Sequence, residues 1–190
     1  MVDFEKLLQY VKDAFTQTDK AHDYWHSYRV YRNSEKIMKD YPQANHEVVI
    51  TAALLHDTVD TKLFSGTEIL DRWLEQSGSE YCSRIREVIS ETSFSAGKSA
   101  SSIESMIVQD ADRLDAIGAI GIARVFTYGG AIGRPIYAEE QISSVSHFDE
   151  KLFKLKANMN TETGRALANN RDSFMRVFLE RLFAEIEGKE

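Results

Sequence analysis

The amino-acid sequence predicts an all-α fold in a single domain. The chain has 190 residues, a length that suits one domain with a sizeable core. Only 2 of its residues are proline, and apolar side chains recur at helical spacing along most of the chain. The pattern divides into about eight or nine helices, with no internal repeat and no linker between them.

The composition is that of a soluble globular protein and argues against several classes of partner. Hydrophobic residues make up 43% and charged residues 28% of the chain. The net charge is −7 with acids and bases interspersed, which argues against a nucleic-acid polymer bound on a broad basic face. The apolar stretch 116–126 is too short to span a membrane. Cys82 is the only cysteine, so a reducing cytoplasm is the expected setting.

The N-terminal part of the chain predicts two helices. Residues 3–17 carry one apolar face, made of Phe4, Leu7, Leu8, Val11 and Phe15. A second helix, expected from about 23 to 40, ends where Pro42 follows Tyr41. His26 lies on its core stripe, and His22 precedes it by one turn on the same side. The pattern alone leaves open whether His26 is a hydrogen-bonded core residue or a metal ligand.

The third predicted helix, residues 46–57, is apolar on every face and ends at an imidazole beside a carboxylate. Val48–Leu55 leaves little polar surface, so the segment is expected to be buried. Asn45 is a good N-cap, and the Ala/Leu-rich second half favours helix over strand. His56 and Asp57 are both metal-ligand types. An isolated doublet of this kind is also consistent with a polar helix end.

Two capping-box patterns predict further helices in the middle of the chain. Ser65-Gly66-Thr67-Glu68 precedes a helix through about residue 76, and another helix is expected over 80–91. After a serine-rich loop, 93–102, Ser101-Ser102-Ile103-Glu104 starts a helix that carries Asp110, Asp112 and Asp115. These three carboxylates lie on different faces, so they will not all bind one ion. A calcium loop is not expected, because the glycine and final glutamate of an EF-hand loop are missing.

The C-terminal part predicts close packing of small residues followed by two helices. Residues 116–130 are small and apolar, and no Lys-Ser/Thr follows them, so helix packing is favoured over a phosphate-binding loop. A helix is expected over 146–159. The last helix is expected over 162–187, with a core stripe of Phe174, Val177, Phe178, Leu182 and Ile186.

The ordered set His26, His56-Asp57 and Asp110 resembles the pattern of the HD superfamily of metal-dependent phosphohydrolases. The superfamily pattern is a histidine, a His-Asp doublet and a later aspartate, and the resemblance here covers roughly residues 20–180. Further blocks resemble one subgroup, the small stand-alone bacterial hydrolases that act like nucleotide pyrophosphohydrolases. These blocks are His22-Asp23 with Arg29-Val30, Leu54 to Asp60 with Lys62, Asp110 to Asp115, Gly118 to Gly121 with Arg124, and His147-Phe148 with Lys151 to Leu155.

This resemblance implies a single HD domain over 1–190, with the metal site in the helical core. The signature region is about 20–115, and helices at about 147–187 complete the site. The implied metal ligands are His26, His56, Asp57 and Asp110. A nitrogen and oxygen ligand set without thiolate suits one divalent ion, Mn²⁺ or Mg²⁺ first, with Fe²⁺, Co²⁺ and Ni²⁺ as further candidates.

Asp57 and Asp60 are the candidate catalytic residues, Asp57 through the metal and Asp60 by orienting water or moving its proton. Asp60 is equally consistent with a helix-end acid paired to Lys62. The candidate substrate contacts are His22, Lys62, Arg113, Lys151 and Lys154.

The activity implied is hydrolysis of a small phosphorylated compound, with a nucleoside triphosphate cleaved to monophosphate and pyrophosphate as the specific expectation. A 5′-nucleotidase, an alarmone hydrolase and a non-catalytic metal- or nucleotide-binding signalling module are the alternatives, and a metal-free helical adaptor is the most distant one. A homodimer is compatible with the sequence. Neither a nucleic-acid polymer nor a membrane is expected as a partner.

Overall fold

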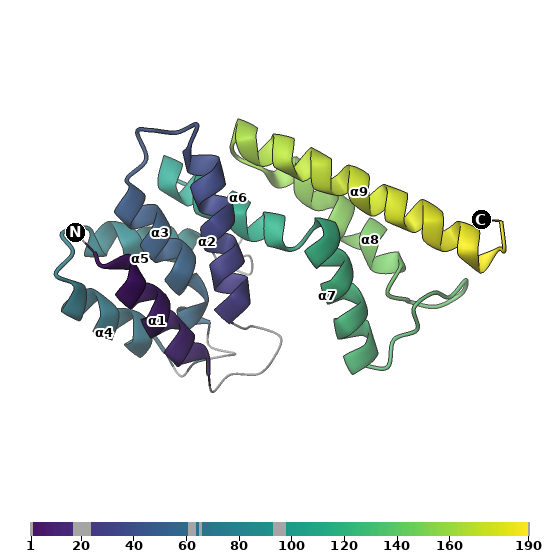
Figure 1. Ribbon diagram of the computed structural model, residues 1–190, viewed down its shortest axis with the longest axis horizontal. Coiled ribbons are helices and arrows are strands. Elements are labelled where there is room, and N and C mark those ends of the chain that lie inside the picture. Colours follow the sequence, from purple (N-terminus) through teal and green to yellow (C-terminus); the bar gives the residue numbers. More distant parts are fainter. Residues whose placement is uncertain (1, 17–23, 61–63, 65, 93–97, 190) are drawn as a thin grey trace. The chain divides into compact units, whose positions relative to one another are not determined.

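Every regular element in the described part of the chain is helical, which confirms the all-α class (Figure 1). The computed structural model describes residues 2–16, 24–60, 64, 66–92 and 98–189. The chain forms two compact units, Met1–Asp112 and Arg113–Glu190. The expectation of one domain over 1–190 stays a prediction, and each unit is described by itself below. None of the described helices is long and apolar enough to cross a membrane.

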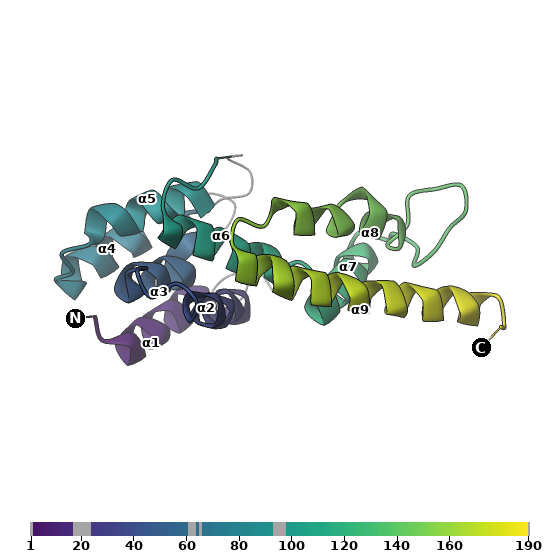
Figure 2. The same cartoon turned by 90° about the horizontal axis from the view of Figure 1, so that it is seen from above.

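The first unit is organised around α3, which spans His46–Leu55. Figures 1 and 2 show α3 enclosed by α1 (Phe4–Phe15), α2 (Tyr24–Met38) and α5 (Cys82–Thr92), and it packs against all three. Each residue from Val48 to Leu55 is buried, as the continuous apolar run predicts. A 3₁₀ helix, η1 (His56–Val59), continues the chain directly. The remaining helices are α4 (Glu68–Ser77) and α6 (Ile103–Asp115), whose last residues belong to the second unit.

Polar contacts fix where α3 begins. The Asn45 side chain accepts a hydrogen bond from the Val48 N–H at 3.1 Å, as expected for an N-cap. The Asn45 N–H in turn donates to Oε1 of Glu104 on α6 at 2.9 Å. Burial opposes ionisation of Glu104, but this bond and the nearby Arg84 guanidinium outweigh it and lower the pKa of Glu104. A buried carboxylate on α6 therefore anchors the start of α3.

The second unit contains the end of α6, then α7 (Gly118–Ala131), α8 (Ser146–Glu150), η3 (Leu152–Asn158) and α9 (Glu162–Ile186). Helix α9 packs against α7 and η3. The contact of α9 with the start of α7 requires glycine at position 118, because its φ is +76° and an added Cβ would lie 3.0 Å from Cγ of Arg171. At Gly118 the predicted close packing of small residues is confirmed, whereas Gly130, in the same predicted stretch of residues 116–130, is exposed, and a Cβ added there would have no neighbour within 4 Å.

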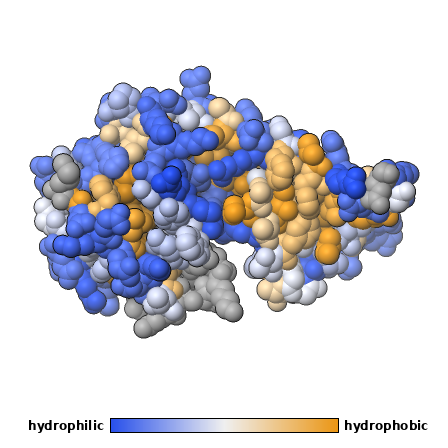
Figure 3. Space-filling model, viewed as in Figure 1, coloured by the Kyte–Doolittle hydropathy of each residue, from blue (hydrophilic) through white to orange (hydrophobic). Residues whose placement is uncertain are grey.

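The structure corrects two expectations for this unit. Residues 146–159 form a short α-helix and a 3₁₀ helix instead of one α-helix, because the backbone breaks at Lys151, with φ −134° and ψ −55°. The predicted core stripe of α9 is also wrong: Phe174 and Val177 are 51% and 60% exposed. The buried side of α9 instead consists of Gly164, Ala168, Asp172, Met175 and Leu179. Figure 3 shows the resulting apolar surface over α7 and α9.

Candidate metal centre

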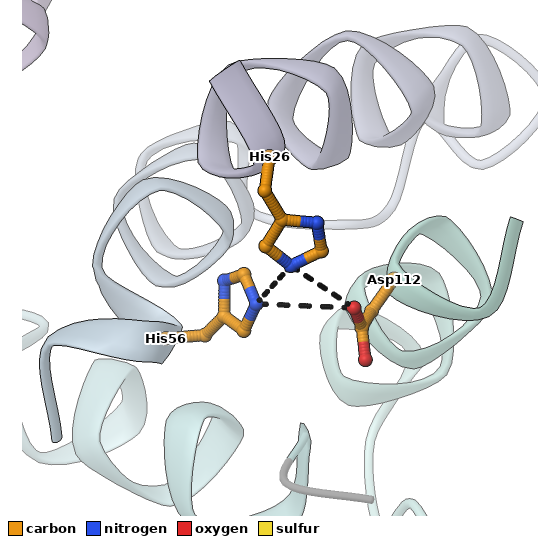
Figure 4. Close-up of side chains that lie close together, drawn as sticks. All are labelled: His26, His56 and Asp112. Carbon is orange, nitrogen blue, oxygen red and sulfur yellow. Dashed lines mark hydrogen bonds and ion pairs between the residues drawn. The ribbon is translucent and has the colours of Figure 1, made fainter. Parts of the chain in front are cut away.

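Two imidazoles from different elements meet in the core of the first unit. His26 lies in the first turn of α2 and His56 is the first residue of η1, and their Nε2 atoms are 3.2 Å apart (Figure 4). Both side chains are nearly closed to solvent, at 7% and 5% exposure. Nδ1 of His56 lies 2.9 Å from the carbonyl oxygen of Ala53, which can only accept a hydrogen bond. Nδ1 therefore carries the proton, and the Nε2 lone pair of His56 points toward His26.

Two carboxylates flank this pair of nitrogens. Oδ2 of Asp57 lies 3.4 Å from Nε2 of His26, and Oδ1 of Asp57 lies 3.2 Å from Nε2 of His56. Oδ1 of Asp112, on α6, lies 3.4 Å and 3.9 Å from the same two nitrogens. The Asp57 and Asp112 side chains are 16% and 24% exposed. The site is therefore closed on the imidazole side and partly open on the carboxylate side.

The donor atoms fit a divalent metal ion. Nitrogen and oxygen ligands at 2.0–2.2 Å from one ion lie about 3.0 Å apart at right angles and about 4.2 Å apart when opposite. The separations from the two imidazole nitrogens to each other and to the carboxylates, 3.2–3.9 Å, fall in that range. Oδ2 of Asp57 is buried without a hydrogen-bond partner, since 3.4 Å exceeds the usual length of such a bond. A cation would satisfy this oxygen and the facing lone pairs together.

The later carboxylate at the site is Asp112, where the sequence pattern suggested Asp110. Among the described residues, His26, His56 and Asp112 each offer one ligand atom, and these atoms all lie within 4.8 Å of one another. Asp57 is outside this group, although its oxygens lie 3.4 Å and 3.2 Å from the two imidazole nitrogens. Asp110 is fully buried and is not part of this group. Residues two positions apart on an α-helix point about 200° apart, so Asp110 and Asp112 point to nearly opposite sides of α6. Residues 107–111 are all buried, so the apolar pattern around them does not fix which side of α6 faces the site.

Of the other predicted site residues, two lie near described neighbours and two lie outside the described part of the chain. Asp60 follows η1. Its backbone N–H donates to the Asp57 carbonyl oxygen at 3.1 Å, and this bond holds the Asp60 backbone close to the His56-Asp57 doublet. His22 and Lys62 lie outside the described residues. Arg113 donates from a guanidinium N–H to the carbonyl oxygen of Asn158 at 2.8 Å.

The two lysines proposed as phosphate contacts belong to the second unit. Lys151 and Lys154 are both exposed, at the break between α8 and η3 and within η3. Their role in phosphate binding, like that of Arg113, stays a prediction.

The chain is similar to known proteins over nearly its whole length. A curated relative, uncharacterized protein YpgQ of Bacillus subtilis strain 168, is 40% identical and covers 97% of this chain and 94% of its own length. The crystal structure of B. subtilis YpgQ in complex with ADP superimposes with a TM-score of 0.80 at 35% identity, over 99% of this chain and all of that one. A Bacillus thuringiensis HD-superfamily hydrolase gives a TM-score of 0.83 at 35% identity, over 96% of each chain.

The family comparison covers the elements that build the candidate metal centre. The HD domain family profile matches residues 24–117, a range that begins on α2 just before His26 and ends just beyond α6. His56, Asp57 and Asp112 all lie inside this range. Together with relatives matched over nearly their full length, this places the protein in the HD-domain family of hydrolases.

Proposed function

We propose that the protein is a metal-dependent phosphohydrolase that converts a nucleoside triphosphate to the monophosphate and pyrophosphate. The observation that carries the proposal is the pair of facing imidazole nitrogens, 3.2 Å apart, between two carboxylates. Two neutral imidazoles and two carboxylates cancel the charge of one divalent ion, and Mn²⁺ or Mg²⁺ suits this nitrogen and oxygen set.

His26, His56, Asp57 and Asp112 would hold the ion. When bound, the ion lowers the pKa of a coordinated water and polarises the phosphate group that is attacked. Within the chain, the Ala53 carbonyl keeps the His56 ring in the tautomer that offers Nε2. The partly exposed carboxylates leave the side of the site on which water and a phosphate can enter.

In the proposed reaction, water is added across the anhydride bond between the α- and β-phosphates. The hydroxyl joins one phosphorus atom, the bridging oxygen leaves with the other phosphate group, and one proton is released. Asp60 is our candidate to orient this water or accept its proton, because it follows the His-Asp doublet by one turn and is bonded to it through the backbone. His22, Lys62, Arg113, Lys151 and Lys154 are our candidates for binding the phosphates.

The nucleotide class is supported by a relative, since a B. subtilis YpgQ structure of similar fold contains ADP. Hydrolysis of a nucleoside monophosphate or of an alarmone uses the same kind of ion and carboxylate chemistry, so these substrates are the alternatives within the family. A non-catalytic nucleotide-binding module is the alternative outside catalysis.

A hydrolysis screen tests the proposal. The purified protein is stripped of metal, resupplied with Mn²⁺ or Mg²⁺, and given nucleoside mono- and triphosphates and an alarmone, with products identified by ³¹P NMR. We expect pyrophosphate from triphosphates, dependent on metal and lost in Asp57→Ala. Asp13→Ala, which removes an exposed carboxylate on α1, is the matched control and should keep full activity.

Each of the other possible products in this screen would indicate a different activity. Orthophosphate from monophosphates would replace the proposal with a nucleotidase, and pyrophosphate from the alarmone alone would replace it with an alarmone hydrolase. Metal bound without turnover of any of these compounds would contradict the proposed activity and favour a binding module.

A further inference from the structure

A buried asparagine joins two of the helices that carry the candidate metal ligands. Asn33 is 8% exposed and lies in the middle of α2, seven residues after His26 and therefore on the same face. Its side-chain Nδ2 donates to the carbonyl oxygen of Ala111 on α6 at 3.2 Å. Asparagine is a poor residue for a helix interior, and burial of its amide is costly without hydrogen bonds. Its presence here therefore points to a specific role for this bond.

The acceptor of this bond directly precedes Asp112. Fixing the position of Ala111 against α2 fixes the adjacent Cα of Asp112, whose Oδ1 lies 3.4 Å from Nε2 of His26. The distance between these two donor atoms depends on how α6 sits against α2, since each atom comes from one of the two helices. The amide of Asn33 lies about two turns along α2 from His26, so it acts on the spacing of the helices and does not touch the ion.

We propose that Asn33 is a positioning residue that sets the spacing between His26 and Asp112 and thereby raises the affinity for the metal ion. The proposal rests on the metal site of the proposed function. Partners that orient metal ligands typically change metal affinity by about 10- to 100-fold when removed. In Asn33→Leu, a side chain of similar size replaces the amide, so the packing volume is kept while the hydrogen bond to α6 is lost.

Loss of a purely structural hydrogen bond would lower stability without changing Mn²⁺ affinity. Tyr10 supplies the matched control for such a bond. Its hydroxyl donates to the carbonyl oxygen of Ile69 at 2.8 Å and thus joins α1 to α4, neither of which carries a candidate ligand. Tyr10→Phe removes one hydrogen bond between helices, as Asn33→Leu does. Both variants should lower the thermal midpoint of unfolding, because each loses a hydrogen bond between helices.

The experiment measures Mn²⁺ affinity of the metal-stripped full-length protein by electron paramagnetic resonance of free Mn²⁺, with no nucleotide present. We expect Asn33→Leu to bind Mn²⁺ about 10-fold or more weakly than wild type, and Tyr10→Phe to bind it as wild type does. Equal affinity in Asn33→Leu and wild type would overturn the positioning role. If Asn33→Leu does not fold, Asn33→Ser decides by the same criterion, since it keeps a polar group but shortens its reach.

The same titration separates failure of this inference from failure of the proposed function. If wild type binds no Mn²⁺, the metal site and the positioning role fall together. If wild type binds Mn²⁺ and hydrolyses no nucleotide, only the proposed activity is contradicted, and the affinity comparison still decides the role of Asn33.

Discussion

Asp112, two positions after Asp110 on α6, places a carboxylate oxygen 3.4 Å and 3.9 Å from the Nε2 atoms of His26 and His56, whereas Asp110 is fully buried. We therefore expect Asp112→Asn to weaken Mn²⁺ binding by at least 10-fold and to remove turnover, because an amide oxygen carries no charge to balance the ion. Asp110→Asn, the same change in a fully buried neighbour, should keep Mn²⁺ affinity within about twofold even if stability falls. Isothermal titration calorimetry measures the Mn²⁺ affinity of the two variants. If Asp110→Asn weakened Mn²⁺ binding more than Asp112→Asn did, Asp110 would be the ligand instead.

The residues of the site differ in how far the sequence could indicate them. The His56-Asp57 doublet ends a continuous apolar run, and His26 lies on an amphipathic stripe, so the local pattern alone points these groups into the core. The choice between Asp110 and Asp112 depends on the rotation of α6 about its axis. Residues 107–111 are all buried, so this part of α6 has no alternation of apolar and polar side chains from which the rotation could be predicted.

The N-terminus of α3 is an element whose contribution can be measured. Asn45→Ala removes the side-chain acceptor of the Val48 N–H, and we expect it to lower the free energy of unfolding by about 1 kcal/mol. Urea denaturation followed by tryptophan fluorescence checks this, since Trp73 lies in the same unit. Asn45→Ser keeps a capping oxygen and should retain most of the stability. Equal losses in the two variants would show that the cap contributes little.

The contact between η3 and α9 predicts a pH dependence. Burial opposes ionisation of Asp172, but hydrogen bonds from Arg176 at 2.9 Å and Lys156 at 3.0 Å outweigh it and lower the pKa of Asp172. A carboxyl with a lowered pKa stabilises the fold above its unfolded pKa of about 3.9, and this stabilisation is lost as the pH falls through the folded value. Asp172→Asn should therefore cost about 1–3 kcal/mol at pH 7.

The difference between Asp172→Asn and wild type should begin to narrow below about pH 4, where the unfolded carboxyl gains a proton, and should vanish only below the lowered folded pKa, where both side chains are uncharged. Urea denaturation followed by circular dichroism at pH 7, 5 and 3 checks this. A difference that stays constant over this range would assign the loss of stability to packing and not to the ion pairs.

Among the elements, the starts of α3 and α9 were predictable, whereas the end of α3 and the buried side of α9 were not. Asn45 and Thr161 cap these helices through their side chains, and such caps are local signals. The buried side of α9 is chosen by what packs against it. Gly164 and Ala168 allow close approach there, while the larger Phe174 remains half-exposed. Apolar size alone therefore indicated the wrong stripe.

At the scale of the whole molecule, the four candidate ligands all belong to the first compact unit. Mn²⁺ at 100 times its dissociation constant should stabilise that unit by about 2.7 kcal/mol, because the ion binds only the folded site. Hydrogen exchange should slow in the amides of α2, α3 and α6 and stay unchanged in α9. Asp57→Ala should remove this protection. Slowing in α9 as strong as in α3 would contradict an effect confined to the first unit.

The division into two units was not predictable from the sequence, although the helical class was. The boundary between Asp112 and Arg113 falls inside α6, which continues through Asp115 without a break. Sequence signals for a boundary are proline, glycine or polar linkers, and a continuous helix contains none of them. Only the packing partners of the residues on either side distinguish the two units.

The donors of the candidate centre are widely spaced along the chain, and this has a consequence for protein synthesis. His26, His56 and Asp57 leave the ribosome well before Asp112, which lies near the end of α6. A nascent chain that ends at α5 already contains the helices around α3 but lacks one carboxylate of the set. Incomplete chains should therefore retain metal poorly, and loading with the ion becomes effective only once α6 has been made and has docked on α2.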